Sequence, residues 1–154
     1  MPVINRADLE FQPADFEDIP VIYSMCKELI DTYEDISQIN YERVLQWVQE
    51  KLNRNITCYS CVYHKGVKVG FFHLLTLKDQ AELDDVYILP QYRGMGIGTN
   101  VLEALILQTK QPIFLYVFKK NLGAIRLYER MGFRISEEVG KTRLIMRRAV
   151  DSAF

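Results

Sequence analysis

Three glycines at alternating positions give this sequence its clearest chemical signature. Gly94, Gly96 and Gly98 follow an apolar, strand-like segment that ends near Ile88, and a helical pattern comes after them. Glycine has no Cβ, so the backbone N–H groups of such a loop can come close to a ligand. The first N–H groups of a helix are also unpaired and carry partial positive charge. The segment therefore predicts a cradle for phosphate oxygens.

Two familiar phosphate motifs fit the glycines poorly. A dinucleotide-binding fold places its first glycine directly after a strand and an acid about twenty residues later. Here five residues separate Ile88 from Gly94, and Phe118, Lys119 and Lys120 stand where the acid belongs. A P-loop would end in Gly-Lys-Ser/Thr, which is missing. A strand-to-helix turn that uses glycine only for packing stays open as the structural alternative.

The cysteines and histidines give no comparable signal. Cys58, Cys61 and His64 are spaced like part of a metal or redox site, but the segment is interpreted as a strand, in which residues three apart point to opposite faces. A zinc site also needs a fourth ligand. We expect ordinary strand cysteines and no metal site. His73, inside another apolar strand, is interpreted as structural rather than catalytic.

The elements that must position these residues follow from hydrophobic spacing. Helical spacing predicts four helices, and alternating or apolar runs predict seven strands. Their order is β-α-α-β-β-β-α-β-α-β-β, a mixed α/β arrangement with an antiparallel middle and a βαβ-like unit in the second half. The predicted strands are Leu9–Gln12, Ile56–Tyr63, Val67–Leu77, Ala81–Leu89, Ile113–Phe118, Phe133–Glu138 and Thr142–Arg148.

The length and composition of the chain are typical of a single globular domain. The 154 residues are predicted to form one domain, with residues 1–7 as an extension and residues 149–154 as a frayed tail. Nineteen basic and twenty acidic residues leave a net charge of −1, which favours neither nucleic acid nor an anionic membrane as partner. The sequence shows neither a signal-peptide pattern nor an apolar run of spanning length, so a cytoplasmic protein is expected. A homodimer stays open.

Two segments resemble signatures of the GNAT superfamily of N-acetyltransferases. Residues 92–98, Tyr-Arg-Gly-Met-Gly-Ile-Gly, resemble its motif A, and residues 121–133 resemble its second signature, N-x-x-A-x-x-L-Y-x-x-x-G-F. Residues 13–20 are similar to the usual entry into its first helix. The resemblance covers about residues 8–148 and implies the GNAT fold: a mixed, mostly antiparallel sheet of about seven strands with about four helices on its faces.

The resemblance implies acetyl-CoA as the acyl donor. Backbone amides of the loop would hold its pyrophosphate, and the strand before the loop would offer main-chain hydrogen bonds to the pantetheine arm and splay away from Ile113–Phe118. Asn121 matches an asparagine that contacts the cofactor, although a helix N-cap is an equal interpretation. The implied cofactor-binding residues are Val86, Tyr87, Ile88, Arg93, Gly94, Met95, Gly96, Ile97, Gly98, Thr99 and Asn121.

The resemblance also implies the catalytic groups. Tyr128 matches the tyrosine that protonates the departing thiolate; a core tyrosine is the structural alternative. A phenol of pKa about 10 facing a thiol of pKa about 8.5 makes full transfer uphill by ~2 kcal/mol, so we expect a hydrogen-bond donor. The amine acceptor must lose a proton, and Glu82, Asp84 and Asp85 are the candidate bases. Solvated strand-end charges, or a base acting through water, stay open.

The acceptor is the least constrained part. The family's usual acceptor region includes Tyr33, Glu34, Asp35 and Tyr41, which could surround a cationic amine. The sequence thus predicts acetyl transfer to a primary amine of a small molecule or peptide. A longer acyl-CoA donor, limited by bulk at Tyr87 and Phe118, and a CoA-binding sensor without turnover are the alternatives.

Overall fold

The computed structural model describes residues 6–150, and within that range the predicted order of elements is confirmed. The helices are α1 (Ile19–Tyr33), α2 (Tyr41–Asn55), α3 (Ile97–Gln108) and α4 (Leu122–Arg130). The strands are β1 (Leu9–Pro13), β2 (Ser60–His64), β3 (Val67–Thr76), β4 (Ala81–Ile88), β5 (Ile113–Phe118), β6 (Arg134–Val139) and β7 (Arg143–Arg148).

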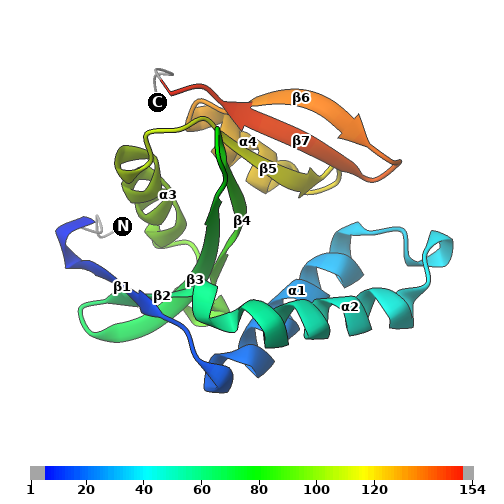
Figure 1. Ribbon diagram of the computed structural model, residues 1–154, viewed down its shortest axis with the longest axis horizontal. Coiled ribbons are helices and arrows are strands. Elements are labelled where there is room, and N and C mark those ends of the chain that lie inside the picture. Colours follow the sequence, from blue (N-terminus) through cyan, green and yellow to red (C-terminus); the bar gives the residue numbers. More distant parts are fainter. Residues whose placement is uncertain (1–5, 151–154) are drawn as a thin grey trace.

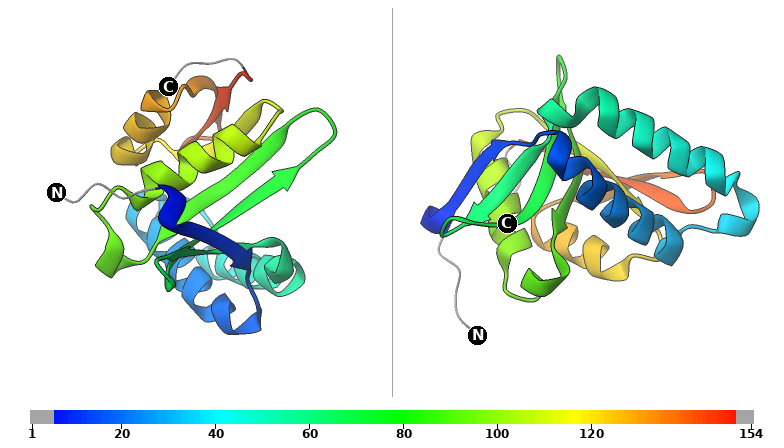
Figure 2. Two further views of the ribbon diagram at one scale, coloured as in Figure 1. Left: turned by 90° about the vertical axis from the view of Figure 1, so that its left-hand side faces the viewer. Right: turned by 90° about the horizontal axis from the view of Figure 1, so that it is seen from below.

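The strands form one sheet in the order β1-β2-β3-β4-β5-β7-β6. Every neighbouring pair is antiparallel except β4 and β5, which are parallel. Helices cover both faces: α1 and α2 pack into one apolar cluster, and α3 and α4 pack into another on the opposite side (Figure 2). This is the mostly antiparallel mixed sheet that the sequence predicts.

The feature that positions the site is a split in the middle of the sheet. β4 and β5 pair only at Ala81–Ile113 and Glu82–Phe114, although β4 continues to Ile88 and β5 to Phe118. Beyond these pairs the two strands diverge, so β5, β7 and β6 form an upper wing and α1 and α2 lie across the opening (Figure 1). The predicted splay is present: in the part of the chain that the structure describes, residues 86–88 pair with β3 but not with β5, and the edge of β4 that faces β5 is called its free edge below.

A β-bulge in β4 decides which side chains enter this opening. Phe72 pairs with Val86 but Leu74 pairs with Leu83, so β4 has one extra residue opposite His73. An extra residue reverses the alternation of side chains beyond it. Asp84 therefore shares the α1–α2 face of the sheet with Tyr87, while Val86 packs toward the α3–α4 cluster.

Local capping explains where the helices near the site begin. Asn40 and Asn121 cap α2 and α4 by accepting hydrogen bonds from the backbone N–H groups of Arg43 and Ala124. Gly132 follows Met131, the C-cap of α4, and has φ +92°, as expected for a glycine that ends a helix. The signature that ends at Phe133 is thus a capped helix with a defined stop.

One expectation needs correction, and another falls partly outside the described range. Residues 56–58 form a 3-10 turn instead of strand, so Cys58 is an exposed turn cysteine, not a strand residue. Cys61 is buried on β2, where desolvation and the neighbouring Asp18 raise the pKa of its thiol to about 12. Of the predicted terminal extensions, residues 1–5 and 151–154 lie outside the described residues. Within residues 6–150, none of the helices has the length and apolar character that a membrane span requires.

Candidate active site

The glycine loop presents its backbone to solvent and its larger side chains to the core. Gly94 and Gly96 have φ values of +78° and +80°, a left-handed conformation that side chains with a Cβ rarely adopt. Gly96 is the N-cap of α3, so the N–H groups that open this helix point out of its N-terminus. Ile97 is buried in the core. Around Gly94 and Gly96 the loop can therefore offer a ligand its main chain, as the predicted cradle requires.

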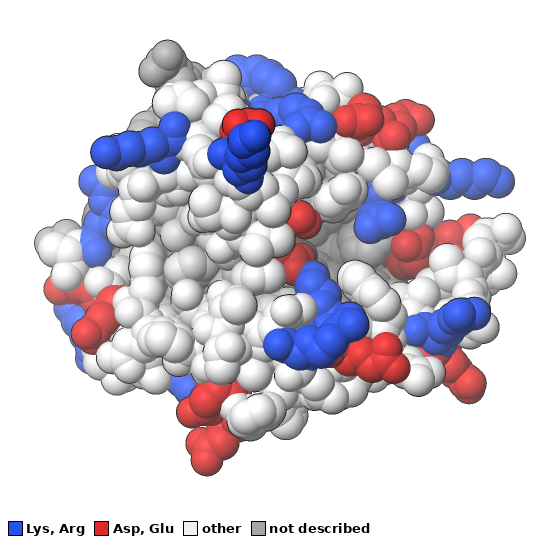
Figure 3. Space-filling view, viewed as in Figure 1, with Lys and Arg blue, Asp and Glu red and all other residues white. Residues whose placement is uncertain are grey.

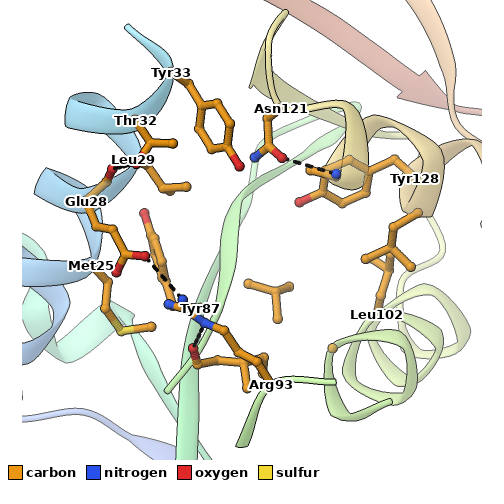
Figure 4. A pocket seen from close by; sticks show the side chains of 15 residues that line it. Met25, Glu28, Leu29, Thr32, Tyr33, Tyr87, Arg93, Leu102, Asn121 and Tyr128 are labelled. Atoms are coloured by element: carbon orange, nitrogen blue, oxygen red, sulfur yellow. Dashed lines mark hydrogen bonds and ion pairs between the residues drawn. The ribbon is translucent and has the colours of Figure 1, made fainter. Parts of the chain in front are cut away.

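A cavity of about 340 Å³, the loop cavity, lies next to this loop (Figure 4). α1 supplies one wall, the free edge of β4 the floor, and α3 and α4 the other wall. Eight of the predicted site residues meet here. The lining residues are Met25, Glu28, Leu29, Thr32, Tyr33, Val86, Tyr87, Ile88, Arg93, Gly98, Leu102, Asn121, Ala124, Leu127 and Tyr128.

Arg93 has a role that the sequence did not reveal. Its Nε donates a hydrogen bond to the carbonyl oxygen of Ile88 at 2.9 Å, and its Nη1 lies 3.2 Å from Oε1 of Glu28 on α1 (Figure 4). The side chain thus ties the loop to the end of β4 and to α1. Because that carbonyl is already engaged, Ile88 has less to offer an incoming ligand than Val86 or Tyr87.

Asn121 and Tyr128 lie on the wall opposite α1. The Asn121 side-chain oxygen accepts from the Ala124 N–H at 3.2 Å, which leaves its amide N–H₂ group on the cavity side (Figure 4). The N-cap and ligand-binding interpretations are therefore compatible. Tyr128 is only 5% exposed and packs edge-on against Phe133, with its hydroxyl directed into the cavity (Figure 4).

A second cavity of about 600 Å³, the hairpin cavity, opens on the other side of the split. It meets the loop cavity at Leu29 and Asn121, which line both. Figure 3 shows the hollow on this face, with acidic side chains at its inner wall and basic side chains at its rim. Its lining comes from α1, α2, β4, β5, β6 and β7, and comprises Leu29, Trp47, Lys51, Glu82, Leu83, Asp84, Tyr116, Val117, Phe118, Asn121, Val139 and Arg143.

Asp84 is held in a polar cluster behind the hairpin cavity. The Lys51 ammonium donates to its Oδ2; the Tyr59 hydroxyl and Nδ1 of His73 lie 3.5 Å and 3.4 Å from the same oxygen. Tyr59 and His73 also stack, with ring centroids 4.4 Å apart. Burial raises the pKa of Asp84, but the hydrogen bond with His73 and the Lys51 charge outweigh it, so the net pKa lies below its usual value.

Glu82 has the opposite electrostatic setting. It lines the hairpin cavity, and among the described residues its carboxylate takes part in neither a hydrogen bond nor an ion pair. Burial, reinforced by the negative charge of Asp84, raises the pKa of its carboxyl. A carboxylate that is poorly solvated and unpaired is a better proton acceptor than one held by an ammonium. Asp85 lies in β4, and its side chain is outside the described structure.

The predicted acceptor residues are divided by the structure. Tyr33 lines the loop cavity and stacks against Phe118, with centroids 6.3 Å apart. Glu34, Asp35 and Tyr41 line neither cavity. The Tyr41 hydroxyl donates to Asp31, and the carboxylates of Glu34 and Asp35 accept hydrogen bonds within their own turn. The predicted acceptor role of these three residues is thus not supported by a place in either cavity.

The comparisons with known proteins agree with this geometry. The family described as "Acetyltransferase (GNAT) family" matches residues 22–133. This match spans more than half of the chain and includes the glycine loop and Tyr128. The chain therefore belongs to the GNAT acetyltransferase family.

Among curated relatives, the spermine/spermidine N(1)-acetyltransferase of Bacillus subtilis is 35% identical over 91 residues, which are 51% of this chain and 60% of that protein. The chain thus spans about three fifths of the length of that relative. The spermidine N(1)-acetyltransferase of Thermoplasma acidophilum is 26% identical over 86% of this chain and 92% of its own length. The ribosomal protein bS18-alanine N-acetyltransferase of Haemophilus influenzae is 41% identical over 42% of this chain and 47% of its own length.

Solved structures support the same fold. A crystal structure of the PaiA N-acetyltransferase from Thermoplasma acidophilum in complex with coenzyme A has a TM-score of 0.61 at 22% identity, covering 92% of this chain and 98% of that one. The ribosomal-protein-S18-alanine N-acetyltransferase of Escherichia coli has a TM-score of 0.65 at 19% identity, covering 95% and 96%. At these identities the likeness concerns the fold alone.

Proposed function

We propose that this protein is an N-acetyltransferase that moves an acetyl group from acetyl-CoA to a primary amine. The observation that carries the proposal is the split between β4 and β5. It connects a cavity edged by free backbone amides with a cavity that holds an unpaired, half-buried carboxylate. The two reactants can thus enter from opposite sides of β4 and meet in the opening.

The loop cavity fits coenzyme A. The N–H groups of residues 94–99 suit a pyrophosphate, because the left-handed glycines and the start of α3 direct successive donors outward. The Arg93 N–H contributes less, since it already contacts the Pro90 carbonyl at 3.3 Å. The free edge of β4 and the Asn121 amide suit the amide groups of a pantetheine arm. When bound, acetyl-CoA supplies an activated acyl group.

Glu82 is the proposed general base. A primary amine of pKa near 10 is mostly protonated at neutral pH and must lose a proton before it can attack. The Glu82 carboxylate has no hydrogen-bond or ion-pair partner among the described residues, and its raised pKa makes it a stronger proton acceptor than an ordinary glutamate. Asp84, bonded to Lys51 and His73, serves instead to raise the pKa of Glu82 by its charge.

Tyr128 is the proposed hydrogen-bond donor to the departing thiolate. Its hydroxyl enters the loop cavity on the wall opposite Tyr87, near the split. A donor fixed by packing against Phe133 stabilises charge that develops on the sulfur without needing to reorganise. This role asks for a hydrogen bond, not a complete proton transfer.

Support for a primary amine as acceptor comes from two sides. The curated relatives are named for polyamines and for the alanine of a ribosomal protein, all of which are amines. The Glu82 carboxylate and the aromatic side chains of Trp47, Tyr116 and Phe118 line a cavity that can receive an ammonium group. These observations support an amine as the acceptor group and leave open which molecule carries that amine.

The first test is thermal unfolding with coenzyme A, acetyl-CoA or NAD, followed by thiol release with a panel of amines. Ligand at a hundred times its dissociation constant adds about 2.7 kcal/mol of stability. We expect a shift with both CoA species, none with NAD, and amine-dependent thiol release. The absence of any shift with CoA would overturn the proposal. A thermal shift with no thiol release would favour a CoA-binding sensor. Thiol release only with a longer acyl-CoA would favour that molecule as the acyl donor in place of acetyl-CoA.

A further inference from the structure

Two opposite charges line the hairpin cavity without a charged partner among the described residues. One is the Glu82 carboxylate and the other is the Arg143 guanidinium on β7. Resting on the function proposed above, we infer that the acceptor is a primary amine that also carries a carboxylate. The amine would lie against Glu82 and the carboxylate against Arg143.

Arg143 is set up to bind an anion. Its guanidinium lies over the ring of Tyr116, 5.4 Å from the ring centroid, and Tyr116 lines the same cavity. Stacking on an aromatic ring orients the planar group while leaving its edge N–H donors available. A carboxylate can accept two of these donors at once, which an ammonium or hydroxyl cannot.

Arg147 provides an internal comparison on the same strand. Its guanidinium lies over Phe114, at 5.5 Å, much as Arg143 lies over Tyr116. Arg147, however, is bonded to Ser136, Gln80 and Glu137, and it does not line the hairpin cavity. Two stacked arginines thus differ in whether their donors are used. The one at the cavity has its donors available.

The remaining charges in the cavity compensate each other. Lys51 is paired with Asp84, so this pair presents no net charge to an acceptor. What remains is one negative and one positive group. An acceptor with a single ammonium leaves Arg143 without an anion, and an acceptor with two ammonium groups places one of them near Arg143 or Lys51. Only an acceptor that carries both charges satisfies both groups.

The size and walls of the cavity fit such an acceptor. A volume of about 600 Å³ exceeds what a simple alkylamine requires. Trp47, Tyr116 and Phe118 supply apolar surface for the carbon chain between the two charged ends. An amino acid or a short peptide-like molecule has these dimensions.

The test uses three acceptors of one chain length with different far ends: aminohexanoate, aminohexanol and hexanediamine. The value of kcat/KM is measured by thiol release from acetyl-CoA, and binding is measured in parallel by thermal unfolding of the protein saturated with coenzyme A. We expect aminohexanoate to exceed both others by about tenfold, since one charge-assisted hydrogen-bond pair separates them. The methyl ester of aminohexanoate should behave like the alcohol.

Arg143→Gln should remove the preference for aminohexanoate while leaving kcat/KM for aminohexanol within about twofold. Arg143→Glu should reverse the order in favour of hexanediamine. Arg147→Gln is the matched control and should keep the wild-type preference. Because Arg143 is an exposed side chain on an edge of the cavity, neither change should prevent folding, and the CoA-induced thermal shift verifies this.

The outcomes separate this inference from the proposed function. Turnover that is equal for the three acceptors, best with hexanediamine, or unaffected by Arg143→Gln would overturn the carboxylate-bearing acceptor and leave acetyl transfer intact. Stabilisation of the CoA complex by aminohexanoate, lost in Arg143→Gln, with no thiol release from any amine, would support the acceptor site and overturn the enzyme. If aminohexanoate caused neither stabilisation of the CoA complex nor thiol release, the inference would be overturned.

Discussion

The two cavities that meet at the split between β4 and β5 differ in the chemical groups that line them. The loop cavity is edged by main-chain groups of one continuous segment and by apolar side chains. The hairpin cavity is defined by charged and aromatic side chains from α2, β4, β5 and β7. Backbone donors fixed by glycines suit a constant ligand such as coenzyme A. The specificity of a cavity lined by side chains can change by single substitutions, so the amine acceptor is expected in the hairpin cavity.

The largest expected effect lies in the hairpin cavity. Glu82→Gln keeps the shape of the side chain but removes the base, and general base catalysis contributes at least about a hundredfold. We expect kcat/KM to fall by about a hundredfold or more while the thermal shift caused by coenzyme A stays unchanged. Steady-state thiol release and thermal unfolding measure the two quantities.

A matched control for this change is Glu103→Gln. Glu103 is a half-exposed glutamate on α3 that pairs with Arg6 and lines neither cavity. It should leave turnover at the wild-type value. An equal loss in both variants would mean that the effect of Glu82 is not catalytic.

The next effect lies at the boundary between the cavities. Tyr128→Phe removes one hydrogen bond to a developing negative charge, which is worth about 1.5 kcal/mol, or about tenfold in kcat. The affinity for coenzyme A should not change. Tyr63→Phe, at a tyrosine on β2 away from the site, serves as control. If Tyr128→Phe raised the dissociation constant of coenzyme A and left kcat unaltered, Tyr128 would be a binding residue only.

For the loop cavity, alanine substitutions at two glycines distinguish the effect of backbone strain from the effect on ligand binding. Gly96 and Gly140 have φ values of +80° and +60°, and neither would bring an added Cβ closer than 3.9 Å to a neighbour. Alanine at either position therefore costs about 1–2 kcal/mol of backbone strain. Only Gly96→Ala should also weaken coenzyme A, by about tenfold, as measured by calorimetric titration. Equal affinity in the two variants would contradict the backbone cradle.

The smallest expected effect is a shift of the pH profile. Glu82 acts when deprotonated, so kcat/KM falls as the pH drops through the pKa of its carboxyl, which lies above the usual glutamate value. Asp84→Asn removes a negative charge that raises this pKa and frees the Lys51 ammonium, which lowers it. The acidic limb should therefore move to lower pH. Asp31 is exposed and lines neither cavity, so Asp31→Asn should leave the acidic limb in place. Movement of the limb to higher pH in Asp84→Asn would refute the coupling.

The contrast between the cavities also explains how far the sequence could predict the molecule. The order of elements follows from hydrophobic spacing, whereas the splay and the cofactor site are implied by the family resemblance, which rests on motifs of neighbouring residues such as residues 92–98. Glycine at a left-handed turn and asparagine at an N-cap leave local marks that can be recognised in a sequence.

The hairpin cavity leaves no such mark. Trp47, Lys51, Tyr116 and Arg143 come from elements far apart in the sequence and meet only through sheet order and strand register. The bulge opposite His73 likewise has no sequence signal, although it places Asp84 and Tyr87 on one face. For Glu34, Asp35 and Tyr41 the sequence predicts a place in the acceptor region because their types suit an amine, whereas in the structure they make local hydrogen bonds and line neither cavity.

The most direct measurement is a crystal structure of the protein with coenzyme A. We predict the pyrophosphate on the N–H groups of residues 94–99, the pantetheine arm along Val86 and Tyr87, and the thiol in the split between Tyr128 and Glu82. Coenzyme A bound in the hairpin cavity beside Arg143, or a thiol directed away from the split, would contradict the account.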